Sequence, residues 1–219
     1  MVKEPDVRRR PPPLPAGVLR APQQQRSREK VARILAATAQ LLERHDHEQI
    51  GTKLIAAEAQ VSIGVLYRFF PDKHAIFSSL MVHWLDQYLA AVESVVDAEL
   101  PPTPSELGAR LISAQVRVRR GTPGHRGLWF HAPPPPELRE YDQAVDRRIA
   151  AVIHAALVRG YGYPDTADFR FRTELVVAAT TQLLITAFKF APDGDPKVLD
   201  EIQLMLDGWL FARAADAGS

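Results

Sequence analysis

The chain has 219 residues, 46% hydrophobic and 24% charged, a balance typical of a globular protein with one sizeable core. It contains no cysteine, which excludes disulfides, thiolate metal ligands and a cysteine nucleophile. The net charge of +1 conceals an asymmetry, because residues 1–73 carry 13 Lys or Arg against 8 Asp or Glu, whereas residues 74–219 carry 14 against 18. The first third is therefore at +5 and the remainder at −4, so the first third is the part expected to contact a polyanion.

The first 25 residues combine six prolines with arginine and glutamine and offer little to bury. We expect residues 1–25 to form a disordered, basic, proline-rich arm, either simply solvated or adding phosphate or minor-groove contacts. No apolar segment follows Arg8–Arg10, so a secretory signal is not expected. The most apolar stretch, Leu175–Phe188, has 14 residues, whereas a membrane span needs about 20. A cytoplasmic protein with no membrane partner is expected.

Apolar residues recur at helical spacing from Ser27 onward, and no run of period-two alternation or internal repeat appears. Ser27 and Asp72 are the expected N-caps of the first and fourth helices. The predicted fold class is all-α, with about nine helices. They are expected at residues 27–45, 52–59, 63–70, 73–99, 105–120, 128–132 (one turn), 137–159, 165–190 and 198–212.

The stretch Thr52–Lys73 predicts two short helices separated by Gln60, Val61 and Ser62. The small Ala56 permits the close approach of two helices that meet near a right angle, and the Ser62 hydroxyl can cap the second helix. Gln60 stands where a turn with φ > 0 normally has glycine, at a cost of about 1 kcal/mol. This arrangement is typical of a helix-turn-helix, in which the second helix enters the major groove.

The segment IAAEAQVSIGVLYRFFPDK, preceded by VARILAATAQLL, resembles the DNA-binding domain of the tetracycline-repressor (TetR) family of transcriptional regulators. The resemblance implies a three-helix DNA-binding domain at residues 26–72 and a helical ligand-binding and dimerisation domain at residues 73–219. It also implies a homodimer on a pseudo-palindromic double-stranded DNA operator, released by a small-molecule effector. The matching residues are Ile55, Ala56, Ala59, Val61, Ser62, Leu66, Tyr67, Phe70 and Lys73.

The resemblance implies base-edge contacts from Ile63, Gly64 and Val65, none of which can make a bidentate hydrogen bond. Base reading would then rely on thymine methyl groups, close backbone approach and DNA shape. Tyr67 and Lys73 resemble the family's phosphate contacts, although core packing is an alternative for the tyrosine and for Phe70. The candidate DNA-binding residues are Thr52, Lys53, Ser62, Ile63, Gly64, Val65, Tyr67, Arg68 and Lys73.

The helices between the DNA-binding unit and the C-terminus enclose a ligand cavity in the family. Aromatic side chains with a few polar groups suit a medium-sized amphipathic molecule, although each taken alone also fits core packing. The segment LWFHA, before four prolines, is expected to shift when a ligand binds, which would tilt the long helix and change the separation of the recognition helices. The candidate pocket residues are Trp84, Tyr88, Gln115, Arg119, Trp129, Phe130, His131 and Tyr141.

The last two helices carry more apolar surface than a terminal helix pair usually needs, which indicates a dimer interface. The resemblance implies a four-helix bundle with the partner copy, and the alternative is that this stripe belongs to the monomer core. The candidate interface residues are Val176, Leu183, Thr186, Phe190, Val198, Ile202, Met205, Leu206, Trp209 and Leu210.

No catalytic constellation, phosphate-binding glycine loop or cofactor motif is recognisable, so an enzyme is not predicted. The histidines of His45–His47 lack i, i+4 helical spacing, so a metal site is not predicted either. The predicted function is a ligand-responsive transcriptional repressor. The alternative is a helical small-molecule-binding protein with weak or lost DNA binding, since Gln60 and the apolar recognition residues depart from the usual pattern.

Overall fold

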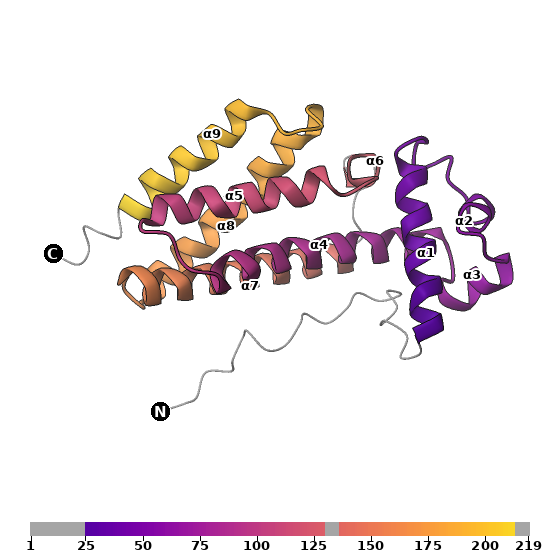
Figure 1. Ribbon diagram of the computed structural model, residues 1–219, viewed down its shortest axis with the longest axis horizontal. Coiled ribbons are helices and arrows are strands. Elements are labelled where there is room, and N and C mark those ends of the chain that lie inside the picture. Colours follow the sequence, from indigo (N-terminus) through magenta and orange to yellow (C-terminus); the bar gives the residue numbers. More distant parts are fainter. Residues whose placement is uncertain (1–24, 130–135, 213–219) are drawn as a thin grey trace. The chain divides into compact units, whose positions relative to one another are not determined.

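The computed structural model describes residues 25–129 and 136–212, so the predicted arm lies almost entirely outside the described residues. Within them the chain forms nine α-helices followed by one π-helical segment and no strand, which confirms the all-α prediction (Figure 1). The elements are α1 (Gln25–Leu42), α2 (Thr52–Glu58), α3 (Ile63–Phe69), α4 (Lys73–Asp97), α5 (Pro104–Arg120), α6 (His125–Trp129), α7 (Pro136–Tyr161), α8 (Ala167–Phe190), α9 (Pro196–Met205) and the π-helix η1 (Leu206–Phe211).

The described residues divide into two compact units. The N-terminal unit consists of residues 25–85, 121–129 and 136–142, and the C-terminal unit consists of residues 86–120 and 143–212. No helix among the described residues is long and apolar enough to cross a membrane.

The N-terminal unit is built around α1, on which α2 and α6 pack. The inner face of α1 buries Ile34 and Leu41 completely, and the buried Thr38 hydroxyl donates to the Ile34 carbonyl at 2.7 Å, which keeps a polar group satisfied in the core. Ser27 lies inside α1, which begins at Gln25, so the predicted cap at Ser27 is wrong. Asp72 does cap the fourth helix, because its carboxylate accepts from the Ala75 N–H at 2.8 Å.

The C-terminal unit packs α8 against α9, and α5 against α9 and η1 (Figure 1). Helix α8 begins at Ala167, two residues after the predicted start at Asp165. Thr166 is its N-cap, because the Thr166 backbone is extended and its hydroxyl accepts from the Phe169 N–H at 3.2 Å. The helix predicted at 198–212 begins two residues earlier, at Pro196, and is α-helical only as far as Met205. Asp195 caps α9 through the Lys197 N–H, and after Met205 the backbone passes into the π-helix.

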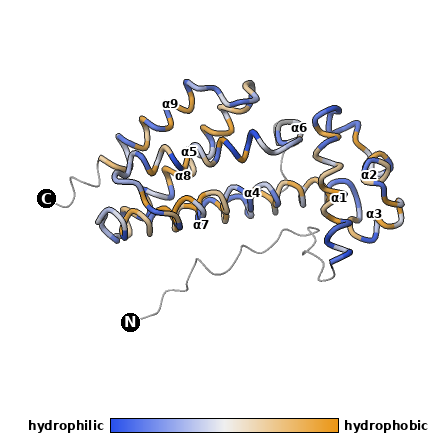
Figure 2. The backbone as a smooth tube through the Cα atoms, viewed as in Figure 1, coloured by the Kyte–Doolittle hydropathy of each residue, from blue (hydrophilic) through white to orange (hydrophobic). Residues whose placement is uncertain are grey.

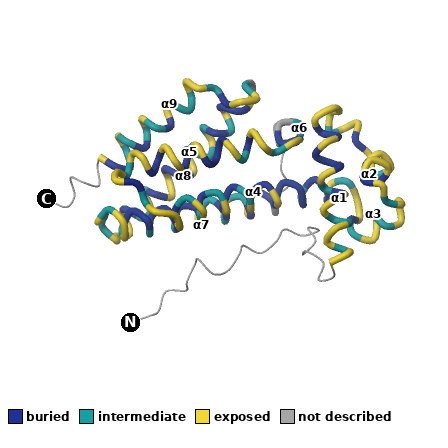
Figure 3. Tube along the Cα trace, viewed as in Figure 1, coloured by how far each residue is buried: buried dark blue, intermediate teal, exposed yellow. Residues whose placement is uncertain are grey.

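Hydropathy varies along the helices of the C-terminal unit (Figure 2). In α7 and α8 the buried positions recur with the helical period (Figure 3), while α8 also exposes the apolar side chains of Phe171 and Leu175. Tyr161 and Gln203 add polar ties, since the Tyr161 hydroxyl donates to the Pro101 carbonyl at 2.8 Å and the Gln203 amide donates to the Ser105 carbonyl at 3.2 Å.

Candidate functional site

The turn between α2 and α3 has the geometry that the sequence predicts. Gln60 has φ = +53°, the left-handed conformation usually taken by glycine, and the following Val61 N–H donates to the Ala56 carbonyl at 3.0 Å. Ser62 then begins α3, with its hydroxyl accepting from the Val65 N–H at 3.2 Å. The hydrogen bonds that end α2 and start α3 therefore offset the strain at Gln60.

Helix α3 has one buried edge and one broad exposed face (Figure 3). Leu66 on the buried edge and Phe70 just beyond the helix are completely buried, so core packing is the correct interpretation for Phe70. Ile63 and Tyr67 are 40% and 51% exposed, and Gly64 is exposed between them. The apolar residues of the predicted reading face are therefore exposed to water, which is unfavourable unless a partner surface covers them.

The exposed Tyr67 is tied to the start of α2. Its hydroxyl lies 3.0 Å from the Thr52 hydroxyl, and either oxygen can donate. This hydrogen bond holds the phenol in one orientation while leaving both oxygens able to contact a further polar group. Core packing, the alternative for Tyr67, is not what the structure shows.

Three cations lie on α2, on α3 and at the start of α4. Lys53 on α2 and Arg68 on α3 are exposed, and Lys73 at the start of α4 is half-buried with its Nζ donating to the Glu48 carbonyl at 3.4 Å. The Glu48 contact positions the ammonium group and uses only one of its three N–H donors. Gly64 has open space where a Cβ would lie, so nothing within the chain requires glycine there.

The described residues hold no group of three or more His, Asp or Glu side chains arranged to bind a metal ion. His45 and Asp46 are exposed and His47 is half-buried, in the turn that follows α1.

Three of the predicted pocket residues meet in the C-terminal unit. The buried Arg119 guanidinium lies 4.0 Å above the Tyr88 ring and donates to the Gln115 side-chain oxygen at 2.7 Å. The Gln115 amide in turn donates to the Tyr88 carbonyl at 2.8 Å. This cation–π and hydrogen-bond cluster fixes two polar side chains in a mostly apolar interior.

The other predicted pocket residues either belong to the N-terminal unit or have side chains that the structure does not describe. Trp84 and Tyr141 are buried in the N-terminal unit. Trp129 is the last residue of α6, and its side chain is not among those the structure describes. Phe130 and His131 lie outside the described residues.

The contact of α6 with α1 was not foreseen from the sequence. A Cβ at Gly127 would lie 2.5 Å from the Leu42 carbonyl oxygen, and one at Gly124, where φ = +74°, would lie 2.6 Å from the Ala39 carbonyl oxygen. The buried His125 ring stacks at a tilt on Trp84, with centroids 5.3 Å apart. The signal available in the sequence was the pair of glycines in GTPGHRG, which permits so close a backbone approach.

Two family patterns match the chain. The pattern for "Bacterial regulatory proteins, tetR family" matches residues 34–80, and that for "Tetracyclin repressor-like, C-terminal domain" matches residues 103–210. The chain belongs to the tetR family. The resemblance drawn from the helix-turn-helix segment is therefore confirmed, and TetR-family regulators are DNA-binding transcription factors that act as dimers.

Among curated relatives, the nucleoid occlusion factor SlmA of Shewanella amazonensis is 37% identical over 76 residues, which is 33% of this chain and 39% of that protein. SlmA of Shewanella frigidimarina is 38% identical over 66 residues, 30% of this chain and 34% of that protein. The matched part of the chain therefore spans less than two fifths of these relatives' length.

Solved structures of TetR-family regulators show the same fold. One from Streptomyces coelicolor aligns with a TM-score of 0.65 and 24% identity, covering 84% of this chain and 99% of the other. A second, from Mesorhizobium loti, aligns with a TM-score of 0.63 and 17% identity, covering 86% of this chain and 98% of the other.

Within the TetR fold the last helices carry the predicted dimer interface, and the structure divides its residues. Val176, Ile202, Leu206 and Leu210 are buried in the C-terminal unit itself, as the monomer-core alternative holds. Thr186 is exposed, and the side chain of Phe190 is not described. The half-buried members of the predicted set are Leu183, Val198, Met205 and Trp209.

The predicted interface set does not include three exposed apolar side chains on the same two helices. Phe171 and Leu175 on α8 are 62% and 43% exposed, and Leu204 on α9 is 62% exposed. Helical periodicity identifies apolar positions on both faces of α8 and α9, but it does not tell which face the chain covers itself.

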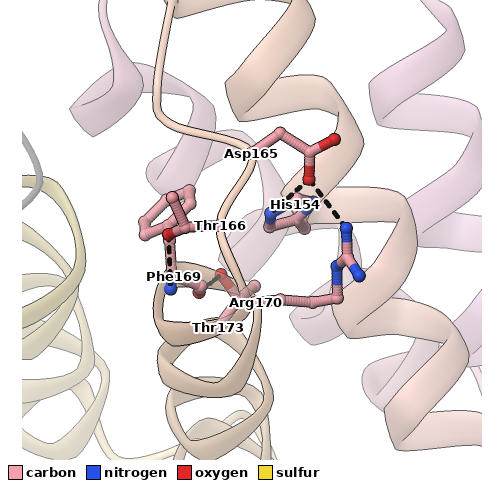
Figure 4. A network of polar contacts seen from close by, with 6 residues as sticks. All are labelled: His154, Asp165, Thr166, Phe169, Arg170 and Thr173. Atoms are coloured by element: carbon pink, nitrogen blue, oxygen red, sulfur yellow. Dashed lines mark hydrogen bonds and ion pairs between the residues drawn. The ribbon is translucent and has the colours of Figure 1, made fainter.

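A second group missed by the sequence lies where α7 meets α8 (Figure 4). The Asp165 carboxylate accepts from the Arg170 guanidinium at 2.8 Å and lies 3.6 Å from Nε2 of the buried His154. The His154 ring packs beside Phe169, with centroids 5.4 Å apart. Burial lowers the pKa of His154 below its ordinary value, against the raising effect of the Asp165 carboxylate, and Arg170 lowers it further.

Proposed function

We propose that this TetR-family regulator is a repressor whose dimer binds a pseudo-palindromic operator through α3 and releases it when a small amphipathic molecule binds the C-terminal unit. The observation that carries the DNA-binding half is the exposed face of α3, held by a capped turn and flanked by Tyr67, Arg68 and Lys73. An apolar face left open beside a phenol and cations suits a groove lined by thymine methyls and phosphates.

In this proposal the exposed Ile63 and the half-buried Val65 contact base edges, and the backbone at Gly64 approaches the groove closely. Tyr67 and Lys73 contact phosphates on either side. The remaining contacts to the sugar–phosphate chain come from Thr52, Lys53, Ser62 and Arg68.

The effector half rests on the cluster of Tyr88, Gln115 and Arg119. An aromatic ring with an amide and a guanidinium beside it offers both stacking and hydrogen bonding, which suits an amphipathic molecule. The proposed domain boundary between residues 72 and 73 separates this region from the DNA-binding helices.

The contact of α6 with α1 suggests how an effector alters DNA binding. Gly124 and Gly127 bring α6 against the carbonyl end of α1, and the Gly124 N–H donates to the Glu43 carboxylate. Because α1 also packs on α2, a ligand that displaces α6 would disturb the support of the helix-turn-helix. Operator affinity then falls by the difference in the ligand's binding free energy between the two states.

A gel-shift titration of the full chain against the promoter DNA next to its gene, followed by footprinting, tests the DNA-binding half. Sequence-specific protection over a two-fold symmetric site is expected. A failure to distinguish promoter from random DNA would instead favour a small-molecule-binding protein without an operator.

The effector half is tested separately with a thermal-shift screen of small amphipathic molecules. A compound that raises the melting temperature should also release the bound promoter DNA. Stabilising compounds that leave the DNA bound would contradict the proposed induction.

A further inference from the structure

Two open grooves run along α5 in the C-terminal unit. The first has a volume of about 430 Å³ and lies between the end of α4 and α5; we call it the α4–α5 groove. The second, of about 410 Å³, lies between α5 and α9, and Ala109, Ser113 and Arg117 line both. The residues lining the α4–α5 groove are Ser94, Val95, Ala98, Ala109, Arg110, Ser113 and Arg117.

The floor of the α4–α5 groove is made of small side chains. Ser94 and Ala98 stand four residues apart on α4 and just beyond its end, Ala109 and Ser113 stand four residues apart on α5, and all four are exposed. Side chains this short allow a third helix to approach both helices to the 8–10 Å typical of helix packing. The groove is open along its length, so a small ligand would remain largely in water, whereas a helix would cover it.

Two hydrogen bonds tie α5 to α4 and to the segment that follows α4. The Gln115 amide donates to the Tyr88 carbonyl at 2.8 Å near one end, and Nη1 of Arg110 donates to the Glu99 carbonyl at 3.0 Å near the other. The two donors stand five residues apart on α5, and they bind one carbonyl within α4 and one just beyond its end. The α4–α5 groove is therefore held by contacts within this unit.

The charges of the groove are all of one sign. Arg110 and Arg117 stand seven residues apart on the same face of α5, about 10 Å along the axis at 1.5 Å per residue, and no acidic residue is among the described lining. Arg117 is exposed and makes no hydrogen bond or ion pair with another described residue. Arg110 uses one N–H on Glu99 and keeps the other guanidinium donors.

We propose that the α4–α5 groove is a docking surface for an acidic amphipathic helix of a partner protein. Apolar side chains of that helix fill the floor over Ala98 and Ala109, and two carboxylates seven residues apart pair with Arg110 and Arg117. Charge complementarity selects this occupant, because guanidinium groups form bidentate pairs with carboxylates. The surface lies on α4 and α5, apart from the DNA-reading helix, so it goes beyond the proposed function.

The test uses the full chain and a fluorescein-labelled synthetic helical peptide about 20 residues long, with leucines on one face and two glutamates seven residues apart. Matched peptides carry two glutamines or two lysines in place of the glutamates. In fluorescence anisotropy the glutamate peptide binds the wild type, and Arg117→Glu weakens that binding by about tenfold or more. Arg159→Glu, an exposed charge reversal near the end of α7, leaves binding unchanged.

A charge swap separates docking from a general loss of structure. The lysine peptide is expected to bind Arg117→Glu more tightly than it binds the wild type, while both proteins keep the same melting temperature and the same promoter affinity. Equal binding of the glutamate and glutamine peptides, or no effect of Arg117→Glu, overturns the proposal. Displacement of the peptide by millimolar inorganic phosphate, or a change in the sedimentation of Arg117→Glu alone, also overturns it, since the groove would then hold a small anion or a second copy.

Discussion

Tyr67 and Lys73 each make one side-chain hydrogen bond within the chain and can still bond to a further partner. The phenol shares a hydrogen bond with Thr52, and the ammonium donates one N–H to the Glu48 carbonyl. Both groups are thereby positioned while retaining donors. The two side chains differ in charge, so their contributions to DNA binding can be told apart by salt dependence.

Replacing Lys73 with alanine is expected to weaken operator binding by roughly 1–2 kcal/mol per protomer. It should also reduce the slope of log K against log salt concentration by about 0.9 per lost phosphate contact, or about 1.8 for a dimer. Tyr67→Phe removes a neutral donor, so it lowers affinity while leaving the slope unchanged. Anisotropy titrations over a range of salt concentrations measure both quantities. Lys197→Ala, an exposed lysine on α9, is the control. A wild-type slope in Lys73→Ala would mean that Lys73 contacts no phosphate.

Gly64 separates the requirements of the fold from those of DNA binding. A methyl group there meets nothing within the chain, and alanine favours a helix over glycine by about 1 kcal/mol, so Gly64→Ala is expected to raise the free energy of unfolding by up to that amount. If the backbone approaches the DNA closely, the same methyl group lowers operator affinity. Urea unfolding and a promoter titration give the two values. A variant that is more stable and binds DNA equally well would exclude close approach at Gly64.

The buried His154 predicts a pH dependence of stability. Because its pKa is lowered in the folded state, the unfolded chain binds more protons between that pKa and the ordinary value of 6.5. The free energy of unfolding should therefore fall as the pH drops below about 6.5, and the stabilisation is fully present above it. Urea unfolding of the wild type and His154→Gln between pH 7.5 and 5.5 measures the difference. Parallel curves for the two proteins would contradict the assignment to His154.

At the scale of elements, helical periodicity and capping chemistry predicted the helices and the helix-turn-helix well. Ser62 and Asp72 act as caps because their side chains reach backbone N–H groups within the same turn, which is a local interaction. The failures involve distant segments. The glycines of GTPGHRG permit the close packing of α6 but do not identify α1 as its partner, and helical periodicity does not show the passage from α9 into a π-helix at Leu206.

The candidate sites divide in the same way. The exposure of Ile63 and Tyr67 follows from the pattern around them, since Leu66 and Phe70 occupy the buried side. For the predicted dimer face the sequence does not separate covered from exposed positions, because Ile202 and the exposed Leu204 are equally apolar and only the packing of α9 on α5 and α8 distinguishes them.

Helix α6 owes its position to glycine. Gly127→Ala places a methyl group 2.5 Å from the Leu42 carbonyl oxygen, a backbone atom that cannot move without shifting α1, so a loss of about 1–3 kcal/mol in the free energy of unfolding is expected. Gly208→Ala, where a Cβ meets nothing within 4 Å, is the matched control and should not destabilise the protein. Urea unfolding curves measure both. Equal stability of the two variants would show that α6 packs less closely on α1 than described.

At the scale of the whole molecule, a two-fold dimer is what turns one short reading helix into a specific binder. A single module covers little DNA, whereas two copies related by a two-fold axis read both halves of a palindromic site. Self-association through the exposed apolar residues of α8 and α9 would bury Phe171, Leu175 and Leu204, which water otherwise covers. Dimer stability and operator affinity are then coupled by mass action.

Leu204→Glu places a charge on this exposed apolar position, so it is expected to shift the chain from dimer to monomer by at least about tenfold in dissociation constant and to weaken operator binding accordingly. The side chain is 62% exposed in the single chain, so the variant should keep the wild-type melting transition of the monomer fold. Analytical ultracentrifugation gives the dimer constant, and promoter titrations at several protein concentrations give the coupled loss. Arg159→Glu, on α7, controls for added negative charge. A dimer of unchanged stability would place the interface elsewhere than on Leu204, and an unchanged operator affinity with a monomeric variant would show that one copy suffices to read the DNA.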